Sequence, residues 1–87
     1  MDRDPAQLAR RRILDAIDLF ERRQCFVTTL QVAASSAEAL GPETAELVEA
    51  LLEELDLVYL RFEDEERQHV AACDVTRRMR KAVIAAE

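Results

Sequence analysis

The chain has 87 residues, of which 49% are hydrophobic and 34% charged, and its formal net charge at pH 7 is −6. This length allows one domain, residues 1–87, with a small core. A single glycine and two prolines argue against a disordered or collagen-like chain and favour helices. No run of 18 apolar residues is present, so we expect no membrane-spanning helix and no membrane partner.

The N-terminus and the cysteines bear on the compartment. MDRDPAQLARRR has no apolar segment behind its charges, so we expect no secretory signal. Cys25 and Cys73 lie far apart and form no CxxC motif, as is typical of reduced thiols. We therefore expect a cytoplasmic protein. Because so small a core is often completed by self-association, a homodimer or another homo-oligomer also fits.

The first predicted helix runs from about residue 5 to residue 23. Pro5 suits a first helical turn, and Asp4 is placed to cap it. Apolar residues recur along this segment at helical spacing: Leu8, Ile13, Leu14, Ile17 and Phe20.

A second and a third helix follow. Thr28 stands three residues before Gln31, the spacing of a capping box, and predicts the start of the second helix. Whether the Ser-Ser pair in its middle divides this helix is left open. The Gly-Pro dipeptide at 41–42 predicts a helix end followed directly by a helix start. The third helix then extends to about Leu55.

After the third helix the pattern changes. Residues 57–62 are rich in β-branched and aromatic side chains and predict a strand, with a turn at 63–66 and a return strand at 68–73. Asp74 is then placed to cap a last helix. The turn has no Gly or Asn to supply a positive φ, and the tract from Phe62 to Glu87 has good helix propensity. A single long helix there, within an all-α helical bundle, is the alternative.

The predicted order of elements is helix, helix, Gly-Pro turn, helix, β-hairpin, helix. Together with the segment TTLQVAASSAEALGPETAELVEALLEELDLVYLRF, this order resembles the winged helix-turn-helix domain of small bacterial transcriptional regulators, over about residues 8–73. The resemblance implies a mainly α fold with a small β-hairpin. It also implies that the third helix enters the DNA major groove and that the hairpin, or wing, touches the backbone. Many such domains have Gly where this chain has Asp56, which also tolerates the left-handed conformation.

The charges of this segment do not fit DNA binding. Residues 38–66 contain eleven acidic residues and one basic residue, Arg61, so DNA phosphates would meet carboxylates there. One interpretation is a solvated face that keeps the protein soluble. The sharper one is a surface that binds a protein with a basic surface, in the extreme by imitating nucleic acid. The residues expected to bind this partner are Glu43, Glu46, Glu49, Glu53, Glu63, Asp64, Glu65 and Glu66.

Arginines on the first and last predicted helices offer a second surface. If these helices pack together, they form a basic face that could contact nucleic acid or the acidic face of another copy. Basic residues near helix C-termini also complement the helix dipole, which is the simpler interpretation. The candidate nucleic-acid contacts are Arg10, Arg11, Arg12, Arg77, Arg78 and Arg80.

No catalytic or metal site is predicted. His69 stands four residues before Cys73, but no third group accompanies them, so we expect a surface histidine and a core cysteine rather than a thiol nucleophile. One histidine and two separated cysteines do not make a zinc site, and a single glycine excludes a phosphate-binding glycine-rich loop. We expect a protein that is not an enzyme and that uses no cofactor.

The predicted strand at 57–62 is apolar on both faces. One face is therefore expected to contact another copy or a partner. The candidate oligomer contacts are Leu57, Tyr59 and Phe62.

These observations predict a non-enzymatic regulatory protein that acts by protein–protein binding through an acidic helix and wing. A small regulator, an adaptor or a phage-type inhibitor would fit. The alternative is a DNA-binding winged-helix transcriptional regulator that uses its basic first and last helices. A structural helical assembly subunit is the third interpretation, favoured if residues 62–87 form one helix.

Overall fold

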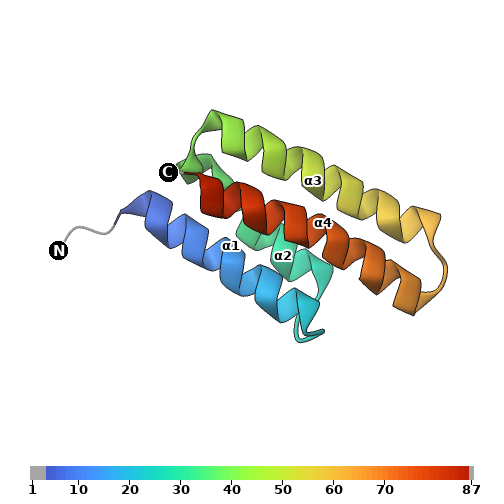
Figure 1. Cartoon of the computed structure of the whole chain (residues 1–87). Helices are drawn as coiled ribbons and strands as arrows, with labels where there is room; N and C mark the ends of the chain where they lie inside the picture. The colour runs from blue at the N-terminus through green and yellow to red at the C-terminus, as the bar shows by residue number, and fades with distance from the viewer. Residues whose placement is uncertain (1–3, 87) are drawn as a thin grey trace.

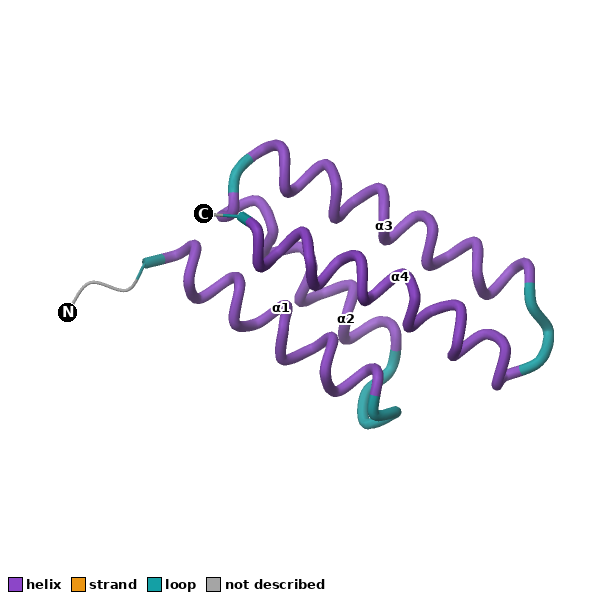
Figure 2. The backbone as a smooth tube through the Cα atoms, in the orientation of Figure 1, coloured by secondary structure: helices purple, strands orange, loops and turns teal. Residues whose placement is uncertain are grey.

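The computed structural model describes residues 4–86, and all regular structure in this range is helical. Figure 2 shows helices joined by short links, with no strand between residues 4 and 86. None of these helices is long and apolar enough to cross a membrane. The elements in chain order are α1 (Pro5–Glu21), α2 (Val27–Ala34), the 3-10 helix η1 (Ser35–Leu40), α3 (Pro42–Arg61) and α4 (Glu65–Ala85).

Successive helices run in opposite directions and form a four-helix bundle. In Figure 1, α4 lies between α1 and α3, and α2 lies behind them. The segment of α2 and η1 closes the fourth side, because it packs against both α1 and α3. The molecule is elongated, with extents of 46 × 24 × 18 Å, and the linked ends of α3 and α4 project beyond the α1–α2 link (Figure 1).

Each long helix buries one apolar stripe along the bundle axis. Buried residues recur every three or four positions, which places them on one side of a helix with 3.6 residues per turn. On α3 these residues are Val48, Leu51, Leu55 and Val58. On α4 they are Ala72, Val75, Thr76, Met79 and Val83, and on α1 they are Ala9, Ile13, Ala16, Ile17 and Phe20.

The predicted β-hairpin is wrong, and with it the winged-helix fold class. Residues 57–61 continue α3, and residues 68–73 lie within α4. The physical reason is that Val58 extends the three-to-four-residue spacing of Leu51 and Leu55, so a helix packs all three against the core, and Phe62 also packs there from the C-cap position. This packing outweighs the β propensity of the segment. The all-α bundle, kept above as the alternative, is the arrangement found.

A three-residue link joins α3 to α4 without glycine. Asp64 is the N-cap of α4, and its side chain accepts a hydrogen bond of 3.3 Å from the Arg67 amide. The Gln68 side chain donates to the Phe62 carbonyl at 2.6 Å and closes the link. Asp74, predicted to cap a last helix, instead lies inside α4. A helix start at Asp64 therefore replaces the predicted hairpin turn.

The end of α1 is a glycine-free Schellman turn. The start is as predicted, because the Asp4 carboxylate accepts from the Ala6 amide at 3.0 Å. At the other end, the Gln24 amide donates to the Leu19 carbonyl at 2.8 Å, and the Arg23 amide donates to that of Phe20 at 3.0 Å. Arg23 has a φ of 63°, in the left-handed region that L side chains disfavour.

The second and third predicted helix starts have different outcomes. The capping box is wrong, because α2 begins at Val27 and the Gln31 side chain donates to Asp56 on α3 at 3.0 Å. The open question of the Ser-Ser pair is answered by η1, in which the helix tightens from Ser35 onward. The Gly-Pro signal is confirmed, because Gly41 has a φ of 103° and α3 begins at residue 42.

Candidate protein-binding surface

The solvent side of α3 combines carboxylates with exposed leucines. Glu46, Glu49 and Glu53 are exposed and stand three and four residues apart, so they share one face of the helix. No ion pair within residues 4–86 involves these three carboxylates. The same face continues to Leu57, which is 50% exposed, and to Leu60, which is 83% exposed. We call these five residues the outer face of α3.

The other predicted acidic residues lie apart from the centre of this face. Glu43 is exposed in the first turn of α3, and residues 63–66 surround the start of α4. These two ends of α3 are about 30 Å apart along a 20-residue helix. Asp64 caps α4, and Glu65 and Glu66 lie in its first turn, where negative charge complements the helix dipole. The eight predicted carboxylates therefore do not form one continuous site.

Glu66 also joins α4 to the α1–α2 link. Its carboxylate accepts two hydrogen bonds of 2.9 Å from the Arg23 guanidinium, a bidentate ion pair at the surface. These hydrogen bonds lower the pKa of the Glu66 carboxyl below its usual value. Glu66 thus has a structural partner in its own chain.

The three predicted oligomer contacts point in different directions. Leu57 belongs to the outer face of α3, whereas Phe62 is half-buried against the core. Tyr59 borders a groove of about 390 Å³ beside the α1–α2 link, together with Phe26 and His69. Burial raises the pKa of the Tyr59 hydroxyl above its usual value. The three side chains therefore do not form a single flat contact surface.

The strand prediction missed three strongly exposed apolar side chains at the same end of the bundle. Leu60 is exposed on α3, Val70 is exposed on α4, and Phe26 is 82% exposed at the N-cap of α2. The signal available for Leu60 was a continuation of the helical spacing of the third helix, whereas the predicted alternative was a long helix over residues 62–87 only. In a helix, Leu60 falls seven residues after Glu53 and therefore on the polar side.

Half of the predicted nucleic-acid contacts are engaged within the chain. The Arg10 guanidinium donates to the carbonyls of Val83 and Ala86 and caps the C-terminal end of α4. Arg78 forms a bidentate pair with Glu54 on α3, at 2.5 and 3.1 Å. These hydrogen bonds hold the pKa of the Glu54 carboxyl below its usual value. Arg78 therefore ties α4 to α3 rather than facing a phosphate.

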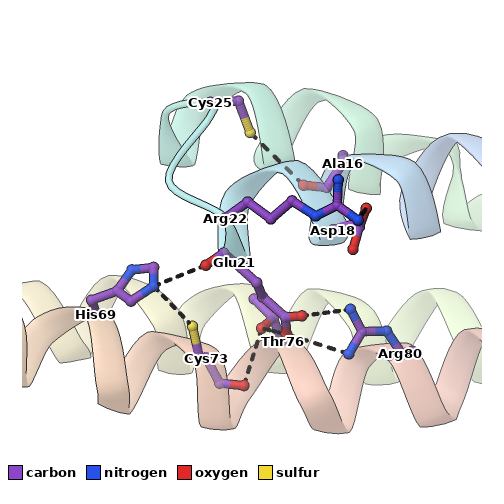
Figure 3. A network of polar contacts seen from close by, with 9 residues as sticks. All are labelled: Ala16, Asp18, Glu21, Arg22, Cys25, His69, Cys73, Thr76 and Arg80. Atoms are coloured by element: carbon purple, nitrogen blue, oxygen red, sulfur yellow. Dashed lines mark hydrogen bonds and ion pairs between the residues drawn. The ribbon is translucent and has the colours of Figure 1, made fainter.

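Arg80 is the third engaged arginine and lies in the polar network of Figure 3. It donates to the Glu21 carboxylate at 2.5 Å, and the buried Thr76 hydroxyl donates to the same carboxylate at 2.6 Å. Burial alone would raise the pKa of Glu21, but these donors outweigh burial and hold it below its usual value of 4.5. The network fastens the end of α1 to the middle of α4.

The remaining predicted basic contacts are exposed. Arg11 and Arg12 lie on the solvent side of α1. Arg77 lies on the solvent side of α4, where its nearest ion-pair partner is Asp74 in the same helix at 3.7 Å. An exposed pair of this kind contributes little to stability and leaves the guanidinium accessible. The predicted basic face is thus reduced to a few arginines on two helices.

His69 and Cys73 are brought together, but not as a nucleophile and its base. The His69 Nε2 atom lies 3.1 Å from the Glu21 carbonyl oxygen and 3.4 Å from the Cys73 Sγ (Figure 3). A carbonyl only accepts, so the first contact places the proton on Nε2, which then cannot take one from the thiol. Burial and the Glu21 charge raise the pKa of Cys73, which keeps it a thiol. His69 instead caps the end of α1.

Neither a group of metal ligands nor a match to a known protein points to a further site. Between residues 4 and 86, no three His, Cys, Asp or Glu side chains are grouped so that they could hold a metal ion. No family model matches the chain, and no curated protein or solved structure is similar to it. The resemblance to winged-helix regulators therefore rests on the sequence pattern alone, without the predicted wing. The outer face of α3 is the strongest candidate site on this molecule.

Proposed function

We propose that the protein is a non-enzymatic regulator or adaptor that binds a basic protein surface through the outer face of α3. The observation that carries this proposal is that three carboxylates without an ion-pair partner within residues 4–86 lie beside two exposed leucines along one helix. Burial of Leu57 and Leu60 against a partner removes apolar area from water and supplies affinity. The carboxylates at 46, 49 and 53 supply charge complementarity, which speeds association and selects a basic partner.

The alternative of a DNA-binding regulator has less support. DNA affinity depends on basic side chains that are free to neutralise phosphates. Arg10, Arg78 and Arg80 are instead bound to carbonyls and carboxylates of the same chain. Protein binding through α3 makes no demand on these arginines, and it uses residues that the bundle leaves exposed.

Binding of a synthetic amphipathic helix of lysines and leucines tests the proposal. The labelled peptide is titrated with the protein at low and high salt and followed by fluorescence anisotropy. The variant Glu46→Gln/Glu49→Gln/Glu53→Gln is expected to bind at least about tenfold more weakly than the unmodified protein.

The control removes the same charge elsewhere. Asp15, Glu38 and Glu63 are exposed, lie off the outer face of α3 and make no ion pair within residues 4–86. The variant Asp15→Asn/Glu38→Gln/Glu63→Gln is expected to bind within about twofold of the unmodified protein, because only its net charge changes. Equal losses in the two variants would mean that net charge, and not the α3 face, attracts the peptide.

A further inference from the structure

A second exposed stripe runs along α4, and its charge is opposite to that of α3. Val70, Arg77, Lys81 and Ile84 are all exposed and are spaced seven, four and three residues apart, so they share the solvent side of the helix. One acidic residue, Asp74, interrupts this stripe. Val70 is 67% exposed and Ile84 is 57% exposed. We call the first four residues the outer face of α4.

The outer faces of α3 and α4 match when two helices are aligned in opposite directions. Along α3 the spacing from 49 to 53 to 60 is four and then seven residues, and along α4 the spacing from 81 to 77 to 70 is the same. The alignment pairs two carboxylates with two basic groups and one apolar residue with another, and it places the Glu46 carboxylate opposite the apolar Ile84, so the match extends over residues 49–60 of α3 and 70–81 of α4. The pairs are Glu49 with Lys81, Glu53 with Arg77, and Leu60 with Val70.

The outer faces of α3 and α4 within one chain do not contact each other. Within the chain, α3 and α4 pack through their core sides, and their ion pair is the Glu54–Arg78 contact. The outer faces point away from that contact, because Glu53 and Arg77 each lie one position, or about 100°, around the helix from it. Only a second molecule can place an α4 outer face on the α3 outer face.

We propose that the partner of the α3 outer face is the α4 outer face of a second copy of this chain. The inference rests on the proposed function in using the same face of α3, and it adds the identity of the partner. The contact joins two different patches, so each added copy leaves one α3 face and one α4 face free. The assembly is therefore head-to-tail, and it forms a ring where the rotation between copies closes and a filament where it does not.

The size of the contact sets its strength. The α3 helix is about 30 Å long, and a contact along one helix face falls at the low end of the range of protein interfaces. The association is therefore weak and reversible, increases with protein concentration and decreases with salt. Sedimentation velocity over a concentration series at two salt concentrations measures this behaviour.

Two complementary variants test the head-to-tail arrangement. Glu49→Lys/Glu53→Lys reverses the charge of the α3 face and keeps the α4 face, and Arg77→Glu/Lys81→Glu reverses the charge of the α4 face and keeps the α3 face. Each variant alone is expected to be monomeric, because its remaining face has no partner in solution. In an equal mixture both contacts can form between the two variants, one with the original charges and one with the reversed charges, so association is expected to return.

The controls place equal charge changes elsewhere. Asp15→Lys/Glu38→Lys and Arg11→Glu/Arg12→Glu are expected to self-associate like the unmodified chain, and far-ultraviolet circular dichroism confirms folding of every variant. Two charge-neutral substitutions, Leu60→Ser and Val70→Ser, are each expected to weaken the contact as single variants while the helical signal stays unchanged.

Several outcomes would overturn the inference. A full chain that stays monomeric at every concentration and salt contradicts it. So does a mixture of the two charge variants that shows no association. In each case, binding of the basic peptide to the α3 face would still support the proposed function, so the two failures are distinguishable.

Discussion

At the scale of single residues, side chains reaching across the bundle complete the helix ends. Arg10 on α1 caps the carbonyls at the end of α4, and His69 on α4 caps the Glu21 carbonyl at the end of α1. Both fill backbone acceptors that a helix cannot satisfy internally. Neither role is visible in the sequence, because it depends on which helices become neighbours. This is why the prediction assigned Arg10 to nucleic acid and His69 to the surface.

Arg10 and Arg11 form a matched pair for testing the cap. Arg10→Met keeps the aliphatic stem and removes the donors, and it is expected to lower the free energy of unfolding by about 1 kcal/mol. Arg11 is exposed and caps no helix, so Arg11→Met is expected to change it by less than about 0.5 kcal/mol. Urea unfolding followed by circular dichroism measures both. Equal effects of the two substitutions would contradict the capping role.

Glu21 gives the stability a defined pH dependence. Its pKa in the folded protein is below the usual value of 4.5, so its stabilising contribution is complete above that value and is lost as the pH falls through the folded pKa. Glu21→Gln is expected to cost about 1–2 kcal/mol at neutral pH, because the Arg80 guanidinium then lacks its charged partner. The difference from the unmodified protein should shrink below pH 4.5. A difference that stays constant down to strongly acidic pH would exclude this role of the carboxylate.

At the scale of elements, two chain reversals depend on unusual backbone conformations. Gly41 has φ 103° and ψ 160°, a region that is essentially restricted to glycine, and an added Cβ would meet no atom within 4 Å. Gly41→Ala therefore tests backbone strain without steric overlap. It is expected to lower the free energy of unfolding by about 1–3 kcal/mol. An unchanged unfolding midpoint would show that the η1–α3 junction relaxes to another conformation.

The reversal at the end of α1 reaches a positive φ without glycine. Arg23→Gly removes the left-handed strain and also the Arg23–Glu66 ion pair, which is exposed and screened by water. Relief of strain is expected to prevail, so the thermal midpoint should stay the same or rise. Arg23→Val also loses the ion pair but keeps a β-branched side chain at positive φ, so its midpoint should fall. The reverse order of the two midpoints would contradict this account.

Elements that depend on local backbone chemistry could be predicted from the sequence, whereas elements that depend on tertiary packing could not. Pro5 with Asp4, and the Gly-Pro dipeptide at 41–42, act through local backbone chemistry, and both signals were confirmed. Residues 57–62 were predicted as a strand from their β-branched and aromatic content. Their conformation depends instead on whether Val58 and Phe62 reach the core, which is decided by tertiary packing. Asp64 as a helix cap was missed for the same reason.

At the scale of the whole molecule, the acidic segment could be located but its shape could not. The carboxylates at 46, 49 and 53 were predicted as a partner surface, and the structure leaves them exposed and unpaired within residues 4–86. Because Leu60 was predicted to lie in a strand, the continuation of this helix face to Leu60 was not predicted. The position of the basic residues Arg77 and Lys81 relative to this face could not be predicted either, because it depends on how α4 packs against α3. Residue types predicted the kind of partner, and the arrangement of these residues depends on the bundle.

Two leucines on α3 separate stability from binding. Leu55 is fully buried, and Leu55→Ala is expected to cost about 2–5 kcal/mol of unfolding free energy. Leu60 is 83% exposed, so Leu60→Ser is expected to change stability by less than about 0.5 kcal/mol while weakening peptide binding. Thermal unfolding and fluorescence anisotropy on the same samples compare the two. A large loss of stability in Leu60→Ser would mean that this side chain belongs to the fold rather than to a binding face.

The most direct test of the central claim is a residue-resolved map of the binding face. Backbone amide resonances of the nitrogen-15-labelled protein are recorded as the basic amphipathic peptide is added. The proposed function predicts that the resonances that move form one stripe, over Glu46, Glu49, Glu53, Leu57 and Leu60. Movements confined to α1, or spread evenly over all acidic residues, would contradict the assignment of the binding site to the outer face of α3.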